Sequence, residues 1–143
     1  MTEAPENLRG SRPGGQRVFV TGVGVVSSIG LGRKEFFEAL ESGRSGISPV
    51  ESFNAAPLGR EFAGEVKGFR PADHLTASEV RRMGRCSAWA LGAARMAVTD
   101  AGLRPEHLRG PRTAVVLGTT MGEADLVAKL GREFIVRGDV GVH

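Results

Sequence analysis

The chain has 143 residues, of which 41% are hydrophobic and 24% charged, values that are ordinary for a folded domain and exclude a wholly disordered chain. Its net charge of +3 is too small to argue for nucleic-acid binding without basic residues clustered on one face. The single cysteine, Cys86, excludes an internal disulfide and favours a cytoplasmic location, and no apolar run reaches the ~20 residues of a membrane span.

Residues 1–16 contain few apolar side chains and are predicted to be a flexible leader before a domain over residues 17–143. That domain opens with an apolar run over residues 17–26, which is typical of a strand buried on both faces of a parallel sheet. Gly22 and Gly24 interrupt the run, and glycine within a strand indicates a bulge or the close approach of another backbone.

A short amphipathic helix of about ten residues is predicted next, because Phe36, Phe37 and Leu40 recur at helical spacing and Gly43 stands where a helix ends. Residues 44–75 show little periodicity and are predicted to be a long surface excursion with a short edge strand over residues 62–66.

One long helix is predicted from Thr76 to Gly102. Thr76 and Glu79 have the spacing of a capping box, and Gly102 is followed by Pro105. Its inner face is rich in alanine, which allows a helix to approach a sheet or another helix closely. Such a helix would be about 37 Å long.

A second buried strand is predicted over residues 114–117, and a third helix from Glu123 to Arg137. Strands alternating with helices favour an α/β fold with a parallel sheet and right-handed crossovers. Because such a sheet usually has five or six strands and only two are found, we predict an incomplete domain.

The segment from Gly22 to Ser27 is a candidate dinucleotide-binding loop. Ser27 replaces the third glycine of the Rossmann fingerprint, and five residues separate it from the helix. Nucleotide binding is therefore the weaker alternative, and we predict no cofactor.

No catalytic or metal-binding constellation is predicted from the residues present. Cys86 is predicted to lie well inside the long helix, on its apolar side. This position favours a role in the core over a catalytic one. His74, His107 and His143 have no ligand spacing and are predicted to be solvated loop residues.

The basic cluster of Arg81, Arg82 and Arg85 leaves two interpretations open. It is either a solvated helix face or a docking surface for an acidic partner.

Four motifs in order resemble the start of β-ketoacyl-[acyl-carrier-protein] synthases, the chain-elongating condensing enzymes. They are RVFVTGVGVVSSIGLGRKEFFEALESGRSGI, REFAGEV, EVRRMGRCSAWALGAARMAVTDAGL and AVVLGTTMGE, and the resemblance covers residues 17–143. It implies the N-terminal part of a thiolase-like fold, and a homodimer when complete.

The resemblance also implies a reaction: decarboxylative Claisen condensation of acyl and malonyl thioesters carried by an acidic acyl carrier protein, without a cofactor. The family's reactive cysteine and two histidines lie further along than this chain extends, so no catalytic role passes to Cys86 or to the histidines here. We therefore expect the chain to be inactive alone.

Two site assignments carry over from the resemblance. Arg81 and Arg82 stand where some family members place basic residues that dock the carrier protein. Met121 stands where an apolar residue lines the acyl pocket near the dimer interface, and its flexible thioether suits such a space. Glu123 departs from the commoner glycine-rich form of the GTTMGE motif. The alternative function is a non-catalytic module for carrier-protein docking or dimerisation.

Overall fold

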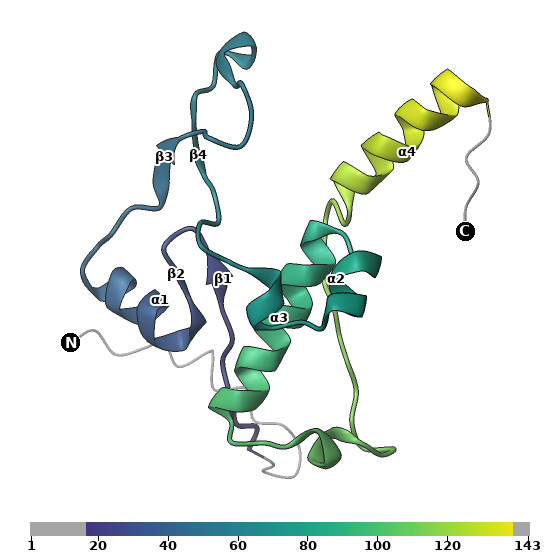
Figure 1. Ribbon diagram of the computed structural model, residues 1–143. Coiled ribbons are helices and arrows are strands. Elements are labelled where there is room, and N and C mark those ends of the chain that lie inside the picture. The colour runs from purple at the N-terminus through teal and green to yellow at the C-terminus, as the bar shows by residue number, and fades with distance from the viewer. Residues whose placement is uncertain (1–16, 139–143) are drawn as a thin grey trace.

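The computed structural model describes residues 17–138. In chain order its elements are β1 (Val26–Ser27), β2 (Gly30–Leu31), α1 (Gly32–Glu41), β3 (Ile47–Pro49), η2 (Ala56–Leu58), β4 (Phe62–Gly64), η3 (Pro71–Asp73), α2 (Ala77–Arg82), α3 (Arg85–Asp100), η4 (Pro105–Leu108) and α4 (Ala124–Arg137). The β1–β2 hairpin, α1 and α3 contact one another at the centre, and the β3–β4 hairpin and α4 project away from them (Figure 1).

The first helix and the edge strand form as predicted. Both α1 and α3 end with a left-handed glycine, Gly43 (φ 67°) and Gly102 (φ 64°). The next residue in each case donates its N–H back into the last turn, Arg44 to Ala39 at 2.9 Å and Leu103 to Val98 at 3.0 Å. The excursion over residues 44–75 contains the predicted edge strand as β4, paired antiparallel with β3.

The close backbone approach that Gly22 and Gly24 predict is confirmed. Residues 17–25 run alongside α3 (Figure 1), and a Cβ at Gly24 would lie 1.8 Å from the carbonyl oxygen of Ala93. A Cβ at Gly22 would lie 2.1 Å from the carbonyl oxygen of Ala97. Glycine in the extended segment and alanine on the facing side of α3 serve the same contact, because only small residues permit the two backbones to approach so closely.

The predicted parallel pairing is not formed among residues 17–138, whose two sheets are two-stranded and antiparallel. Residues 17–25 and 113–119 pass α3 in the same direction as extended chain but carry no strand pairing (Figure 1). Both segments have largely uncovered side chains, with Val18 77% and Val116 94% exposed. Since burial on both faces is what stabilises a parallel strand, these segments lack the neighbours that would hold them in a sheet.

The prediction of a single helix from Thr76 to Gly102 is wrong in one respect. The capping box at Thr76 is present, but α2 ends at Arg82 and α3 begins at Arg85. Met83 (φ −116°, ψ 143°) and Gly84 (φ −76°, ψ 176°) are extended and redirect the chain between the two helices. The carboxylate of Glu123 occupies the space at this break, 2.1 Å from where a Cβ of Gly84 would lie.

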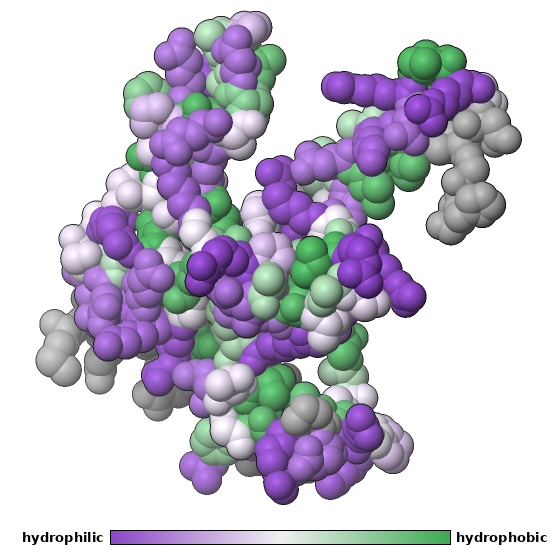
Figure 2. Space-filling model, in the orientation of Figure 1, coloured by the Kyte–Doolittle hydropathy of each residue, from purple (hydrophilic) through white to green (hydrophobic). Residues whose placement is uncertain are grey.

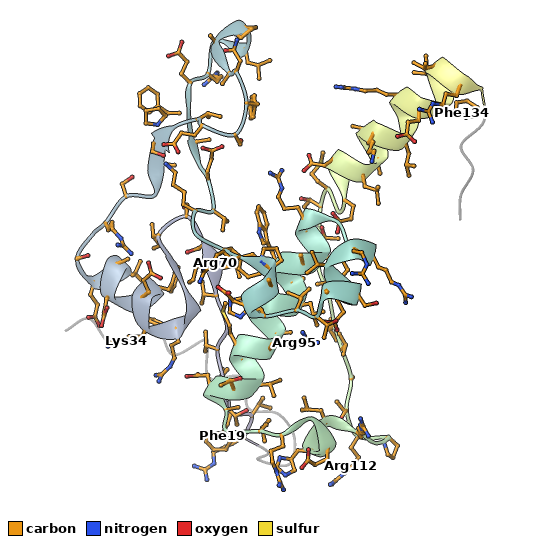
Figure 3. All side chains as sticks on the ribbon, in the orientation of Figure 1. Phe19, Lys34, Arg70, Arg95, Arg112 and Phe134 are labelled. Carbon is orange, nitrogen blue, oxygen red and sulfur yellow. The ribbon has the colours of Figure 1, made fainter. Side chains whose placement is uncertain are left out.

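The described residues bury little. The buried hydrophobic side chains are Ala39, Ala55, Leu75 and Ala88, and no large side chain is fully buried. Apolar side chains remain at the surface between polar ones in Figure 2, and Phe134 projects from the far part of α4 in Figure 3. Among residues 17–138, no helix has both the length and the hydrophobicity that crossing a membrane requires.

Candidate functional site

A cavity of about 610 Å³ lies where three segments converge. One wall is the end of the first apolar run, residues 24–26, and a second is the first half of α3, including Cys86, Trp89 and Ala93. The third wall is the GTTMGE region, residues 117–119 and 122–123. Most of this lining is small or apolar, so the cavity suits an apolar group more than a charged one.

Glu123 joins the third wall to α3. Its Oε1 accepts a hydrogen bond from the N–H of Ser87 at 2.6 Å, and its Oε2 accepts one from the N–H of Cys86 at 3.2 Å. These amides belong to the first turn of α3, where no intrahelical acceptor is available. The hydrogen bonds from Ser87, with the amide of Cys86 and the charge of Arg85, hold the pKa of Glu123 below its usual value.

A second contact joins α3 to the start of α4, which directly follows the third wall. Arg85 of α3 forms an ion pair with Asp125 of α4, at 2.8 Å, and its guanidinium lies 5.3 Å from the ring centre of Trp89. Within the connecting loop, the Gly122 N–H donates to Thr119 Oγ1 at 3.0 Å. The loop is therefore fixed internally as well as to α3.

The three predicted basic residues do not form one cluster. Arg81 and Arg82 are exposed in the last turn of α2 and make no ion pair with any residue between 17 and 138. Arg85 lies beyond the break in the helix and is already engaged by Asp125 and Trp89. Arg81 and Arg82 thus remain available to an external anion, whereas Arg85 serves the internal contact.

Met121 is 77% exposed in the bend before α4. It lies between two residues that line the cavity wall, Thr119 and Gly122, but its own side chain is not part of the lining. The role in an acyl pocket remains a prediction, and it would require the side chain to turn or a further surface to cover it.

Cys86 occupies a different place from the predicted one. Because α3 begins at Arg85, Cys86 is in the first turn of the helix, half-buried at the cavity. No histidine lines this cavity among the described residues.

The histidines also differ from prediction in part. His74 is half-buried, with its ring stacked on Phe69 at 5.2 Å and an interplanar angle of 10°. His107 is exposed, and its Nδ1 accepts a hydrogen bond from the N–H of Arg104 at 3.1 Å. His143 lies outside the described residues. Within residues 17–138 no group of His, Cys, Asp or Glu side chains has the arrangement of a metal site.

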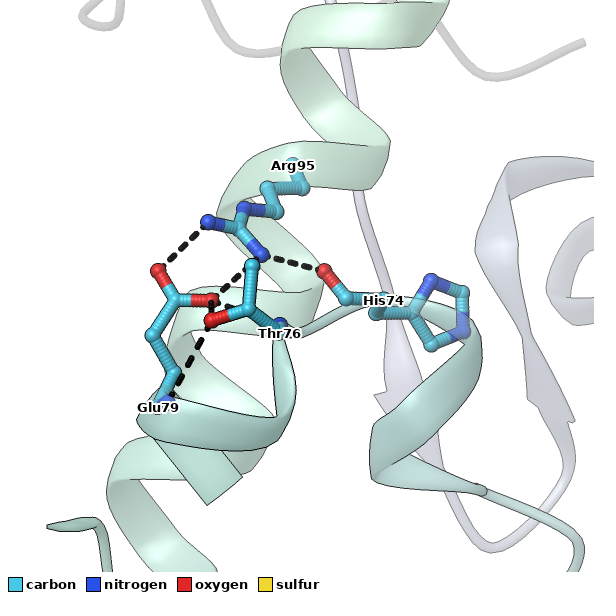
Figure 4. A network of polar contacts seen from close by, with 4 residues as sticks. All are labelled: His74, Thr76, Glu79 and Arg95. Atoms are coloured by element: carbon cyan, nitrogen blue, oxygen red, sulfur yellow. Dashed lines mark hydrogen bonds and ion pairs between the residues drawn. The ribbon is translucent and has the colours of Figure 1, made fainter. Parts of the chain in front are cut away.

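A polar network holds α2 against α3 (Figure 4). Arg95 of α3 donates from Nη2 to Glu79 Oε1 at 2.7 Å and from Nη1 to Glu79 Oε2 at 3.1 Å, and it also donates to the carbonyl of His74. Glu79 Oε2 accepts as well from the N–H of Thr76 at 2.8 Å. Hydrogen bonds from Arg95 first, and then from Thr76, lower the pKa of Glu79 from 4.5 to about 2.

The spacing of Thr76 and Glu79 predicts the capping box, but no local pattern predicts the partners that give it a tertiary role. Arg95 and Glu123 act across separations of 16 and 36 residues, and no local spacing marks such pairs. The one available signal was Glu123 itself, a charged residue at the end of a glycine-rich motif.

Comparison with known proteins gives a consistent result. Residues 15–138 match the family described as "Beta-ketoacyl synthase, N-terminal domain". A 3-oxoacyl-[acyl-carrier-protein] synthase 2 of Synechocystis is 36% identical over 107 residues, covering 75% of this chain and 26% of that protein. A β-ketoacyl synthase assigned to granaticin polyketide synthesis in Streptomyces violaceoruber is 36% identical over 126 residues, covering 88% and 29%.

Among solved structures, the ishigamide ketosynthase/chain length factor is similar, with a TM-score of 0.75 and 39% identity. The match covers 84% of this chain and 30% of that one. It confirms the predicted fold class, an α/β thiolase-like fold of which only the N-terminal part is present here. The chain spans less than a third of the length of each of these relatives.

Proposed function

The chain belongs to the β-ketoacyl synthase family, and from this premise we propose that it supplies the carrier-protein surface and one wall of the acyl site of a condensing enzyme. The reaction proposed for that enzyme is decarboxylative Claisen condensation in fatty acid or polyketide synthesis. A malonyl thioester loses carbon dioxide, and the resulting carbanion attacks the carbonyl of an acyl thioester. The new carbon–carbon bond forms, and the carbon–sulfur bond of the acyl thioester breaks as the thiolate that carried the acyl group leaves.

The observation that carries the docking role is the position of Arg81 and Arg82. Both guanidiniums are exposed on α2, which the network of Glu79 and Arg95 fixes on α3. The first turn of α3 lines the apolar cavity. An acidic carrier protein seated on these arginines would therefore present its thioester near a cavity of suitable chemistry.

The acyl part of the substrate is proposed to enter the cavity between residues 24–26, α3 and the GTTMGE region. Trp89 and Ala93 offer apolar contacts there. Met121 is proposed to contact the acyl chain once a neighbouring surface covers its exposed side chain.

We further propose that the chain does not catalyse condensation alone. The cavity presents one thiol, Cys86, and no histidine among its described lining residues, so the thiol lacks the base that would activate it. Incubation with acyl and malonyl carrier protein should give no condensation product above a protein-free control. Robust turnover would reject this part of the proposal.

The docking role is tested by titration with acyl carrier protein at low salt, using the double variant Arg81→Glu, Arg82→Glu. The Kd should rise about tenfold or more, because two attractive charges become repulsive. The matched control is Arg109→Glu, Arg112→Glu, which changes the net charge equally in an exposed loop at the opposite end of α3 from α2 (Figure 3).

An equal loss of affinity in the two double variants would show that binding depends on net charge alone. Arg81 and Arg82 would then not be the docking site. Unchanged affinity in the first variant would remove the docking role altogether.

A second candidate function is a non-catalytic assembly module, which dimerises or joins a complete synthase. It is supported by the exposed apolar residues of 115–117, with Val115 93% exposed, and of α4, with Ile135 83% exposed. Sedimentation of the chain at several concentrations distinguishes the two: a stable homodimer that does not bind carrier protein favours assembly.

A further inference from the structure

The contact between Glu123 and α3 assigns a structural role to the last residue of the GTTMGE region. Glu123 stands at the end of the GTTMGE region, between the cavity-lining loop and α4. Its carboxylate reaches back to the helix that forms the opposite wall of the cavity.

The geometry of this contact is specific. Each carboxylate oxygen accepts from a different amide of the first turn of α3, at 2.6 Å from Ser87 N and 3.2 Å from Cys86 N. A negative charge is favoured at this position because the first-turn amides and the helix dipole are positive there. Charge-assisted hydrogen bonds of this kind are about twice as strong as neutral ones.

All parts of the contact belong to the cavity. Cys86, Ser87 and Glu123 line it, as do Gly118 and Thr119 from the same loop. A loop held at Glu123 therefore has its lining residues held at a fixed distance from Trp89 and Ala93 on the opposite wall.

The charged groups around the contact favour an ionised Glu123. Arg85 lies in the same turn of α3, and Asp125, the nearest acid on α4, is itself paired with Arg85 at 2.8 Å. Among the described residues that line the cavity, Cys86 is the other residue with a titratable side chain.

We propose that Glu123 is a positioning residue: it clamps the loop over residues 117–123 onto the first turn of α3 and so sets the width of the cavity. Where the cavity is an acyl site, which rests on the function proposed above, the clamp sets how tightly the site discriminates between acyl chains. Glu123 itself need not touch the substrate.

The test uses Glu123→Gln, which keeps the shape of the side chain and removes its charge. Hydrogen exchange at the amides of Cys86 and Ser87 should accelerate about tenfold, as expected for the loss of a charge-assisted hydrogen bond. Quenching of Trp89 fluorescence by acrylamide should increase, and because Trp89 is the only tryptophan in the sequence, the signal comes from one residue of the cavity lining.

The matched control is Glu133→Gln in α4, whose carboxylate makes no hydrogen bond or ion pair within residues 17–138. It removes the same charge from the same helix and should leave exchange and quenching unchanged. Equal far-ultraviolet circular dichroism of the two variants and the wild type establishes that differences arise locally. Exchange or quenching in Glu123→Gln that equals the wild type would overturn the clamp.

The acyl part of the inference is tested by titrating octanoyl and hexadecanoyl N-acetylcysteamine thioesters while following Trp89 fluorescence. The ratio of the two Kd values should shift at least threefold in Glu123→Gln and stay constant in Glu133→Gln. A wild-type chain that binds neither thioester removes the proposed acyl site, and the clamp is then decided by exchange and quenching. An unchanged ratio with accelerated exchange overturns the selective role.

Discussion

At the scale of single residues, three carboxylates accept backbone hydrogen bonds at places where no regular secondary structure supplies an acceptor. These places are the first turns of α2 and α3 and the extended segment before β1. Glu79 stabilises the first turn of α2 and binds Arg95, while Glu123 stabilises the first turn of α3. Asp100 does the same for the extended segment, accepting from Val23 N at 3.0 Å and from Arg33 Nε at 2.7 Å. Each joins segments that the sequence does not place near one another.

The network at Glu79 predicts a defined pH dependence. Its pKa is lowered from 4.5 to about 2, so its contribution to stability is complete above pH 4.5 and is lost as the pH falls towards 2. The stability difference between wild type and Glu79→Gln should therefore be largest near neutral pH and vanish near pH 2. Urea unfolding at a series of pH values, followed by Trp89 fluorescence, measures it.

The wild type is compared with the Glu79→Gln variant because other carboxyl groups also make the stability of the wild type depend on pH. A backbone hydrogen bond from Val23, together with Arg33, also lowers the pKa of Asp100. Glu41→Gln, in the last turn of α1, serves as the control for the loss of one carboxylate, because Glu41 makes no ion pair within residues 17–138. A Glu79→Gln difference that stays constant down to pH 2 would contradict the assigned contact.

At the scale of elements, the main contact is between α3 and the extended segment over residues 17–25. The approach of the two backbones permits no side chain at Gly22 or Gly24. The small residues Ala93 and Ala97 face the segment, so the two elements can lie closer together than larger side chains would allow.

Replacing Gly24 by alanine should separate these elements. The new Cβ would overlap the backbone of α3 at Ala93, and relieving that overlap should cost about 1–3 kcal/mol of unfolding free energy. Gly118→Ala is the control, because nothing lies within 4 Å of a Cβ at that position. Urea unfolding of both variants would settle the point: similar midpoints would mean that the contact does not exist in solution.

At the scale of the whole molecule, the described residues expose apolar side chains that would be buried in a complete α/β domain. Val115 and Val116 are 93% and 94% exposed in a segment that has no strand partner among the described residues. An extended, apolar and unpaired segment is a template for pairing with another chain.

We therefore expect the isolated chain to self-associate. The double variant Val115→Lys, Val116→Lys should reduce association at least severalfold in analytical ultracentrifugation, because charge on an unpaired strand opposes pairing. Val127→Lys on exposed α4 is the control for a general gain in solubility. A wild-type chain that stays monomeric at high concentration would show that the exposed segments are covered in solution.

Much of the local structure was predictable because its causes are local. Periodicity and capping residues gave α1, the start of α2 and α4 within a residue or two, and Gly22 and Gly24 indicated a close backbone contact. The break at Met83 and Gly84 was missed because the residue that stabilises it, Glu123, is distant in the sequence. Cys86 was misplaced for the same reason.

The sequence by itself determined the family, the class of fold and the positions of most helices, since these follow from motif order, hydrophobic spacing and turn residues. Only the tertiary structure decided that the predicted long helix is two helices, that Arg85 is engaged while Arg81 and Arg82 are free within residues 17–138, and that Glu123 closes one wall of the cavity. The physical reason is that a charged side chain pairs with the unsatisfied amides or the guanidinium that folding places next to it. Those neighbours are distant in the sequence, so only the three-dimensional structure identifies them.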